Sequence, residues 1–272
     1  MGDDFTRQLL EYINNTTVAL LDDVGRYRDF LGFLSRMNSD QKIANKMLIY
    51  GYDPEATDVR TRKEWNKVGA RISDETTKIY LLEYDESSAV KYTPIEAFDI
   101  RNTDARRKIE TIFQDSGEFA ETVMASAPCK IRFDDKASVK EKCCYNSEQK
   151  EILVTNNFRD YDEIVQSLLR EYAHVYLDDI YRKAFTDKQK SSNEYHYNRE
   201  AHRAEALSSG YMICSRYNRK LPEIPYVRRG SNISLAAIRA GLDNMCVAFS
   251  KSATTIDKKY LSLRKSYEHI MS

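Results

Sequence analysis

The sequence predicts an α+β fold in which helices predominate and the few strands form small sheets. Only five prolines and nine glycines interrupt the 272 residues, which favours long helices. Apolar residues recur at helical spacing towards both ends of the chain, whereas the period falls to two around residues 78–95 and 129–154. Hydrophobic residues make up 42% of the chain, which is enough for a packed core.

The N-terminal segment, residues 4–51, is predicted to be helical. Side chains such as Leu9, Ile13 and Leu34 follow helical spacing. The polar run at 38–40 is expected to cap a last short helix, since the side chains of Asn, Ser and Asp accept hydrogen bonds from free amides.

A first sheet is predicted downstream of this segment. A turn at 53–56 and a short helix at 62–67, which should end at Gly69, precede it. Alternating apolar and polar residues then indicate a hairpin and its continuation. These strands are expected at 78–82, 90–95 and 97–100.

A second domain is predicted to follow a charged linker helix at 103–114. Its strands again alternate, and helices fill the rest of the chain. The strands are expected at 129–133, 143–145 and 152–154, the last two as a hairpin. The helices are expected at about 160–181 and 198–217, with two more between 234 and 269.

The composition limits the classes of function. The 42 basic side chains balance the 42 acidic ones, so any nucleic-acid-binding surface has to be a local patch. No secretory signal and no apolar run of membrane-spanning length is present, so we expect a cytoplasmic protein with no membrane partner. None of the five cysteines stands in a C-x-x-C pair, which favours reduced, mostly buried thiols.

One segment carries the pattern of a metallopeptidase helix. In H-E-x-x-H, two histidines one turn apart share a zinc ion, and the glutamate activates the bound water. Here Glu171 and His174 are present, but Arg170 replaces the first histidine. A guanidinium cannot donate a lone pair to zinc, so one of the usual three protein ligands is missing. The pattern therefore predicts a degenerate site.

The next helix offers residues that could complete such a site. His202 and Glu205 are three residues apart, so both can point at one spot, and the small residues that follow let this helix approach the first closely. One interpretation is a zinc site with His174, Glu205 and His202 as ligands and Glu171 as general base. The other is a buried ion pair of Arg170 with Glu205 in the place of the metal. We expect that zinc is not bound.

Basic and aromatic residues interleave around the only tryptophan. Charges for phosphates and flat rings for bases are what a single-strand groove needs. The alternative is a helix whose basic face is solvated and whose tryptophan lies in the core. The residues concerned are Arg60, Arg62, Lys63, Trp65, Lys67 and Arg71, with Tyr50, Tyr52 and Tyr80 nearby in sequence.

The order and spacing of several motifs resemble the ArdC-type antirestriction family. In the N-terminal half these are an asparagine-to-isoleucine helix, a P-x-A-T turn, a tryptophan-to-glycine element and an F-D-I-x-x-T strand end. In the C-terminal half they are the degenerate zinc helix and the Ala-Glu-Ala of the following helix. The matching segments are 45–49, 54–57, 65–71, 97–103, 168–174 and 204–206.

The resemblance implies three regions. They are an N-terminal single-stranded-DNA-binding domain at 1–108, a zincin-like metallopeptidase domain at 109–225 and a C-terminal helical extension at 226–272. The chain departs from the family at 52–53 and 73–76, which weakens the transfer of DNA contacts, and at Arg170, which weakens the transfer of peptidase activity.

These expectations combine into one main hypothesis. It is a protein of mobile genetic elements, similar to ArdC and LtrC-like proteins, that binds single-stranded DNA and carries a degenerate, inactive zincin-like domain with a small antiparallel sheet. That domain would serve as a scaffold or as a surface for a protein partner. The alternatives are an active zinc metallopeptidase with the altered ligand set, and a plain interaction module.

Overall fold

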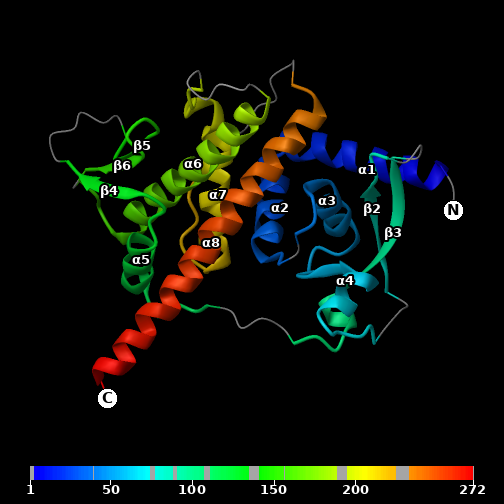
Figure 1. The fold of residues 1–272 in the computed structure, drawn as a ribbon, viewed down its shortest axis with the longest axis horizontal. Coiled ribbons are helices and arrows are strands. Elements are labelled where there is room, and N and C mark those ends of the chain that lie inside the picture. Colours follow the sequence, from blue (N-terminus) through cyan, green and yellow to red (C-terminus); the bar gives the residue numbers. More distant parts are fainter. Residues whose placement is uncertain are drawn as a thin grey trace. The chain divides into compact units, whose positions relative to one another are not determined.

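The computed structural model confirms the α+β class, with long helices and two small sheets among its described residues (Figure 1). The structure describes residues 3–38, 40–73, 77–87, 91–106, 111–134, 141–155, 157–188, 195–224 and 233–271. None of the helices in these ranges is long and apolar enough to cross a membrane. The chain divides into two compact units: unit 1 is Met1–Ile109 with Tyr226–Asp243, and unit 2 is Glu110–Pro225 with Asn244–Ser272.

Unit 1 begins with helices in the segment where the sequence predicted them. They are α1 (Asp3–Asp22), α2 (Val24–Arg36) and α3 (Ile43–Tyr52). Asp23 is the N-cap of α2, because its carboxylate accepts the amides of Gly25 and Arg26. The periodic apolar side chains of all three helices are buried and form much of the core of the unit.

The N-terminus of α3 is capped from far away in the sequence. Its N-cap residue is Lys42, whose side chain makes no capping hydrogen bond. Instead, the amide of Ile43 donates to Oδ1 of Asp243, 2.8 Å away. The local cap predicted at 38–40 (of which Ser39 lies outside the described residues) is therefore wrong, because a carboxylate from the last helix satisfies the free amide.

The sheet of unit 1 is antiparallel, with the strand order β1-β3-β2. Its strands are β1 (Val59–Thr61), β2 (Ile79–Tyr84) and β3 (Tyr92–Asp99), so the predicted hairpin and its continuation are present. The side-chain amide of Asn45 closes the outer edge of β2 by accepting the Leu82 amide at 2.9 Å and donating to the Leu82 carbonyl at 3.1 Å. The short helix α4 (Arg62–Lys67) follows β1 through a capping box of Thr61 and Glu64.

The linker helix predicted at 103–114 is absent from the described part of that range. After a 3-10 turn, η1 (Ile100–Asn102), Thr103 forms a β-bridge with Ile72. The Thr103 hydroxyl accepts the amide of Ala105, and the Asp104 carboxylate accepts the amide of Arg71. These side-chain bonds to the backbone compete with helical ones, which explains the wrong prediction.

The sheet of unit 2 is mixed, not antiparallel as predicted. Its strands are β4 (Lys130–Phe133), β5 (Cys143–Asn146) and β6 (Glu151–Val154), in the order β4-β6-β5. The β5–β6 hairpin is present, and β4 pairs with β6 in parallel. The tight turn sets only the direction of β5 against β6. Strand β4 pairs with the other edge of β6, where no turn joins the two strands and fixes their relative direction.

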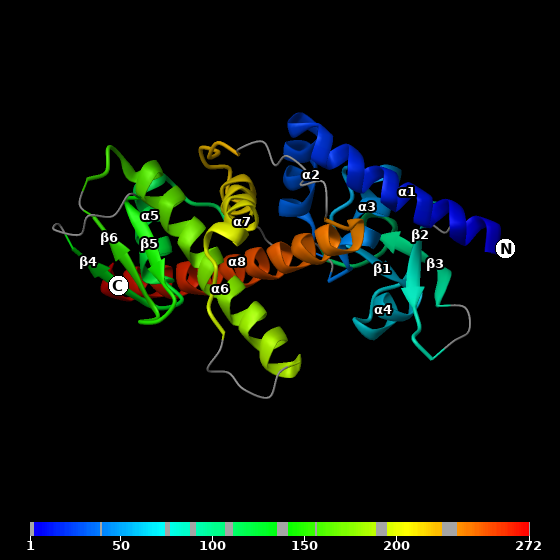
Figure 2. The ribbon, with the colours of Figure 1, turned by 90° about the horizontal axis from the view of Figure 1, so that it is seen from above.

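The helices of unit 2 bring the predicted motif segments together. They are α5 (Ser116–Ala125), which was not predicted, α6 (Tyr161–Lys188) and α7 (Arg203–Arg216), the last preceded by the 3-10 turn η3 (Glu200–His202). Helices α6 and α7 pack side by side (Figures 1 and 2). A Cβ on Gly210 would lie only 3.5 Å from the backbone nitrogen of Arg170, so the small residues do allow the close approach expected of them.

The last helix, α8 (Leu235–Met271), is continuous where two helices were predicted (Figure 2). Its buried side chains keep a helical spacing along its length, so no point favours a break. They include Leu242, Met245, Phe249, Ile256 and Tyr260. Residues as far as Asp243 belong to unit 1, and those from Asn244 belong to unit 2.

Candidate functional site

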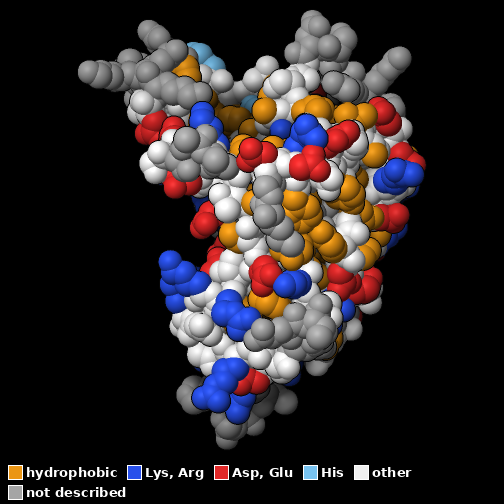
Figure 3. Space-filling view, turned by 90° about the vertical axis from the view of Figure 1, so that its right-hand side faces the viewer, with side chains coloured by type: hydrophobic (Ala, Val, Ile, Leu, Met, Phe, Trp, Pro, Cys, Tyr) orange, Lys and Arg blue, Asp and Glu red, His pale blue; other side chains and the backbone are white. Residues whose placement is uncertain are grey.

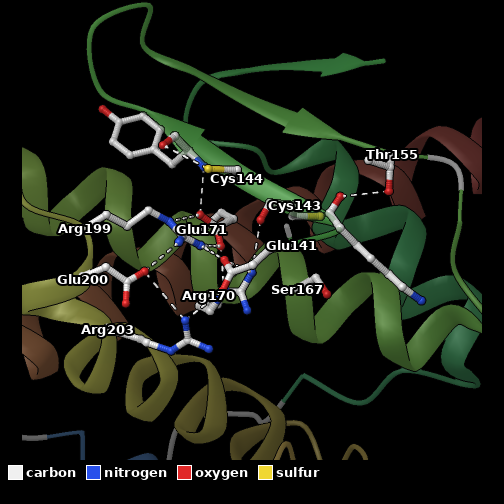
Figure 4. A network of polar contacts seen from close by, with 12 residues as sticks. Glu141, Cys143, Cys144, Thr155, Ser167, Arg170, Glu171, Arg199, Glu200 and Arg203 are labelled. Atoms are coloured by element: carbon white, nitrogen blue, oxygen red, sulfur yellow. Dashed lines mark hydrogen bonds and ion pairs between the residues drawn. The ribbon is translucent and has the colours of Figure 1, made fainter. Parts of the chain in front are cut away.

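The segment Arg170–His174, in which the sequence predicted a degenerate zinc motif, lies in the buried middle of α6, beside β5 (Figure 4). Glu171 and His174 are fully buried, and the side chain of Arg170 is 15% exposed. The carboxylate of Glu171 accepts hydrogen bonds at both oxygens. Oε1 accepts from Arg170 Nε at 2.6 Å and Arg199 Nη2 at 2.7 Å, and Oε2 accepts from Arg199 Nε at 3.1 Å and the Tyr145 amide at 2.8 Å.

These contacts, which we call the arginine clamp, determine what Glu171 can do. The clamp consists of Arg170 and Arg199 on the carboxylate of Glu171. A general base has to reach the proton of a bound water with a free lone pair. Here two guanidinium groups and a backbone amide already donate hydrogen bonds to both oxygens of this carboxylate. A buried charge is stable only when it is paired and hydrogen-bonded in this way.

A second carboxylate, that of Glu141, joins the same arginines. It forms ion pairs with Arg170 at 3.1 Å, with Arg199, and with Arg203 at 2.8 Å (Figure 4). Burial alone would raise the pKa of Glu141, but the nearby charge of Arg170 and the hydrogen bond from Arg199 outweigh it and lower that pKa. The group is therefore ionised and part of one network with the clamp.

The predicted ion pair between Arg170 and Glu205 is wrong, because Arg170 pairs with Glu171 and Glu141 instead. The carboxylate of Glu205 accepts from the hydroxyl of Tyr181 at 3.0 Å and contacts Nδ1 of His202 at 2.9 Å. His202 and Glu205 do point at one spot, as their spacing predicted, but each is the partner of the other.

Arg170 and Glu171 also bind the main chain along the outer edge of β5. In the order β4-β6-β5, strand β5 is an edge strand. The carbonyl of Cys143 accepts from Arg170 Nη2 at 3.1 Å, and the amide of Tyr145 donates to Glu171. An extended peptide binds a sheet edge through such main-chain groups. Along this stretch of β5 they are already used within the chain.

His174 has a buried ring nitrogen that no hydrogen bond uses in the described part of the chain. Its Nδ1 lies 2.9 Å from the hydroxyl of Tyr197, while Nε2 is buried without a hydrogen-bond partner in the described chain. Burial, with the charges of Arg199 and Arg170, lowers the pKa of His174 to about 2. The imidazole is therefore neutral at ordinary pH.

The described residues do not fit a zinc ion. A catalytic zinc needs about three protein ligands, and no three His, Cys, Asp or Glu side chains in the described ranges stand close enough to hold a metal. His174 offers one suitable nitrogen. However, His202 and Glu205 bind each other, and two guanidinium groups put positive charge where a cation would meet Glu171.

The basic cluster of unit 1 divides into buried and exposed residues. Trp65 is 1% exposed and its indole N–H donates to the Phe98 carbonyl at 2.8 Å, so its ring lies in the core rather than on a binding surface. Arg60 lies above that ring and makes two hydrogen bonds to Asp58. The side chains at the exposed surface are those of Arg62, Lys63, Lys67 and Arg71.

Figure 3 looks onto the side of the molecule where Figure 1 draws α4, β2 and β3. Lysine and arginine side chains there form small groups interspersed with acidic and hydrophobic ones.

Sequence reasoning missed the partners of the motif. Arg199 precedes the two residues assigned as metal ligands on the second helix, Arg203 lies between them, and Glu141 lies just before a predicted strand. Nothing in their spacing indicates that they meet Glu171. The one available signal was the replacement at Arg170, since a buried cation needs a nearby carboxylate.

Among known proteins, the chain matches solved structures. No protein-family model and no curated protein matches the chain. The chain is similar to crystal structures of the antirestriction ArdC protein from plasmid R388, one Mn(II)-bound and one metal-free. The sequence identities are 13% and 12%, with 93% and 92% of this chain and 97% and 98% of those chains covered, and both TM-scores are 0.44.

Proposed function

We propose that this chain is an ArdC-like protein associated with mobile elements that binds single-stranded DNA through unit 1 and has a catalytically inactive zincin-like unit 2. The main support is the arginine clamp, in which both oxygens of Glu171 accept hydrogen bonds from guanidinium groups. The zincin-like character rests on the motif in α6 and on its resemblance to the family's zinc helix.

The inactivity follows from charge and geometry. An H-E-x-x-H peptidase needs a cation opposite the glutamate and a water between them. In this chain Arg170 and Arg199 stand opposite Glu171 and bond to it directly. Unit 2 then serves as a scaffold or as a surface for a protein partner.

The proposal for DNA rests on exposed charge next to a rigid core. Buried Trp65 anchors α4 to β3, so the basic side chains on and after α4 are held at the surface. Cations in such positions can bind phosphates without reading bases. Exposed Tyr52 is the aromatic side chain of the predicted set that remains available for stacking.

We predict that Arg170→His alone does not create a tight zinc site. Arg199 would still hold Glu171 and bring its positive charge close to the ion. Metal content after dialysis against zinc should therefore remain well below one equivalent in this variant. The wild-type chain and Glu171→Gln provide the comparison. Stoichiometric zinc, or peptidase activity that Glu171→Gln abolishes, would refute the inactive site.

We predict that Arg62→Ala/Lys63→Ala weakens binding of a single-stranded oligonucleotide and makes it less dependent on salt. Each lost phosphate contact should reduce the slope of log K against log salt by about 0.7. Fluorescence titrations at two salt concentrations measure it. Arg26→Ala/Arg28→Ala, which removes two exposed cations from α2 in the same unit, is the matched control. Equal affinities and slopes for the two double variants would contradict the proposed surface.

A further inference from the structure

Three guanidinium groups converge on the carboxylate of Glu141 (Figure 4). Oε2 is shared by Arg170 and Arg199, while Oε1 accepts from Nη1 of Arg203 at 2.8 Å. Two acceptor oxygens thus face donors from three side chains. An acceptor with three oxygens would give each arginine its own.

The three arginines stand on a frame that does not depend on Glu141. Arg170 and Arg199 are held by Glu171, which lies buried behind them. Arg203 begins α7, and Glu200 lies 3.7 Å from it. Glu141, by contrast, lies just before β5 and outside any helix or strand. If the side chain of Glu141 moved away, the three guanidinium groups would keep their positions.

The charge balance also favours an anion of higher charge. Without Glu141, the three arginines face only Glu171 and Glu200, so one positive charge is in excess. A phosphate monoester carries about −1.5 to −2 at neutral pH and has three acceptor oxygens, which suit guanidinium donors. A carboxylate supplies one charge and two oxygens.

The three arginine side chains are partly buried, but each retains some exposure to solvent. The side chains of Arg170 and Arg199 are 15% and 17% exposed, whereas that of Arg203 is 44% exposed. Donors in such a position lose less of their binding energy to water than surface cations do.

We propose that Arg170, Arg199 and Arg203 form an oxyanion site for a phosphate monoester, which Glu141 occupies in cis when no such ligand is bound. The side chain of Glu141 thereby acts as an internal competitor. This site is independent of the proposed DNA-binding surface, which lies in unit 1, but it rests on the same arginine clamp as the proposed inactivity of unit 2.

The test is calorimetric titration of the full chain with inorganic phosphate at constant ionic strength. Glu141→Gln should bind phosphate at least about tenfold more tightly than wild type, because a competing charge is removed. Adding Arg203→Ala should reverse the gain by about tenfold, the worth of one charge-assisted hydrogen bond. Glu200→Gln removes an equal charge from an exposed carboxylate beside the same arginines and should stay close to wild type.

Either of two results would overturn the proposal: Glu141→Gln binding no more tightly than Glu200→Gln, or retention of the gain when Arg203→Ala is added. A second measurement does not require the Glu141 variant to fold. Phosphate should raise the melting temperature of the wild-type chain above its value in chloride of equal ionic strength, and Arg203→Ala should abolish the rise. An equal rise in both proteins would also refute the site.

Discussion

Glu171 and Glu141 bind the same two arginines in different surroundings. Glu171 is fully buried, while the side chain of Glu141 is 19% exposed. Loss of a cationic partner therefore leaves a buried charge in the first case and a carboxylate that water can reach in the second. Arg199, which binds both carboxylates, should therefore contribute more to stability than Arg203, which binds Glu141 but not Glu171.

We predict that Arg199→Leu destabilises the fold by about 3 kcal/mol, because it leaves the buried carboxylate of Glu171 only partly satisfied. Arg203→Leu should cost less than about 1 kcal/mol, because it removes only the more exposed partner of Glu141. Urea unfolding followed by circular dichroism measures both. Equal losses would show that the clamp does not stabilise the fold.

A prediction for pH follows from His174. Its pKa is lowered to about 2 in the folded state, against an ordinary value of 6.5, which the unfolded chain should show. The unfolded state therefore binds more protons between these values, so stability falls as the pH falls below about 6.5. Between pH 6.5 and 5 the free energy of unfolding should decrease by up to about 1.4 kcal/mol per pH unit.

His174→Gln should remove most of this slope, whereas His196→Gln, at an exposed position, should leave it in place. Urea unfolding across this pH range provides the measurement, above the range in which carboxylates titrate. A slope unchanged in His174→Gln would contradict a neutral, buried imidazole.

The motif residues could be placed from the sequence, but their partners could not. Arg170, Glu171 and His174 share one helix, so spacing alone fixes their relation. Arg199 and Glu141 reach them through tertiary packing, which no local pattern records. The predicted partner Glu205 was wrong because Tyr181 and His202 bind it instead.

Among the elements, strand β2 depends on a side chain from α3. Asn45 is buried and makes both hydrogen bonds that a neighbouring strand would make to Leu82. An edge strand with unpaired groups is a site for unwanted pairing. A buried asparagine in a helix thus completes the sheet.

We predict that Asn45→Ala costs about 2 kcal/mol, because it leaves the buried amide and carbonyl of Leu82 without partners. Asn66→Ala, at an exposed position on α4, should change stability by less than about 0.5 kcal/mol. Unfolding followed by the fluorescence of Trp65, which lies in the same unit, measures the difference. Similar losses for the two variants would rule out this role of Asn45.

Hydrophobic periodicity predicted the helices and strands in which it is regular. It did not predict features that depend on residues distant in the sequence. The helices of 4–51 and the two hairpins follow directly from periodicity. The cap of α3 depends on Asp243, and β4 pairs in parallel with β6, a strand to which no turn joins it. Neither leaves a signal in the neighbouring residues.

For the whole molecule, the predicted division into 1–108, 109–225 and 226–272 stays a proposal about how the chain folds. Its first boundary lies within one residue of the end of the first segment of unit 1. The proposed extension, however, contributes residues 226–243 to unit 1 and the remainder to unit 2.

We predict that deletion of 226–272 destabilises both units rather than trimming a tail. Unit 1 would lose Asp243, the cap of α3, and unit 2 would lose buried residues such as Met245 and Ile256. Trp65 fluorescence reports on unit 1, and hydrogen exchange in α6 reports on unit 2. A chain that ends after Arg264 is the control. Native behaviour of either unit in the deleted chain would contradict shared dependence on α8.

The shared helix also limits how such a chain can recombine. A cassette of residues 1–109 transferred between proteins would arrive without the carboxylate that caps its third helix. A working exchange has to move two separate stretches of the gene together, and the second has to end in the middle of a helix. We therefore expect the two halves of this chain to be inherited as a pair.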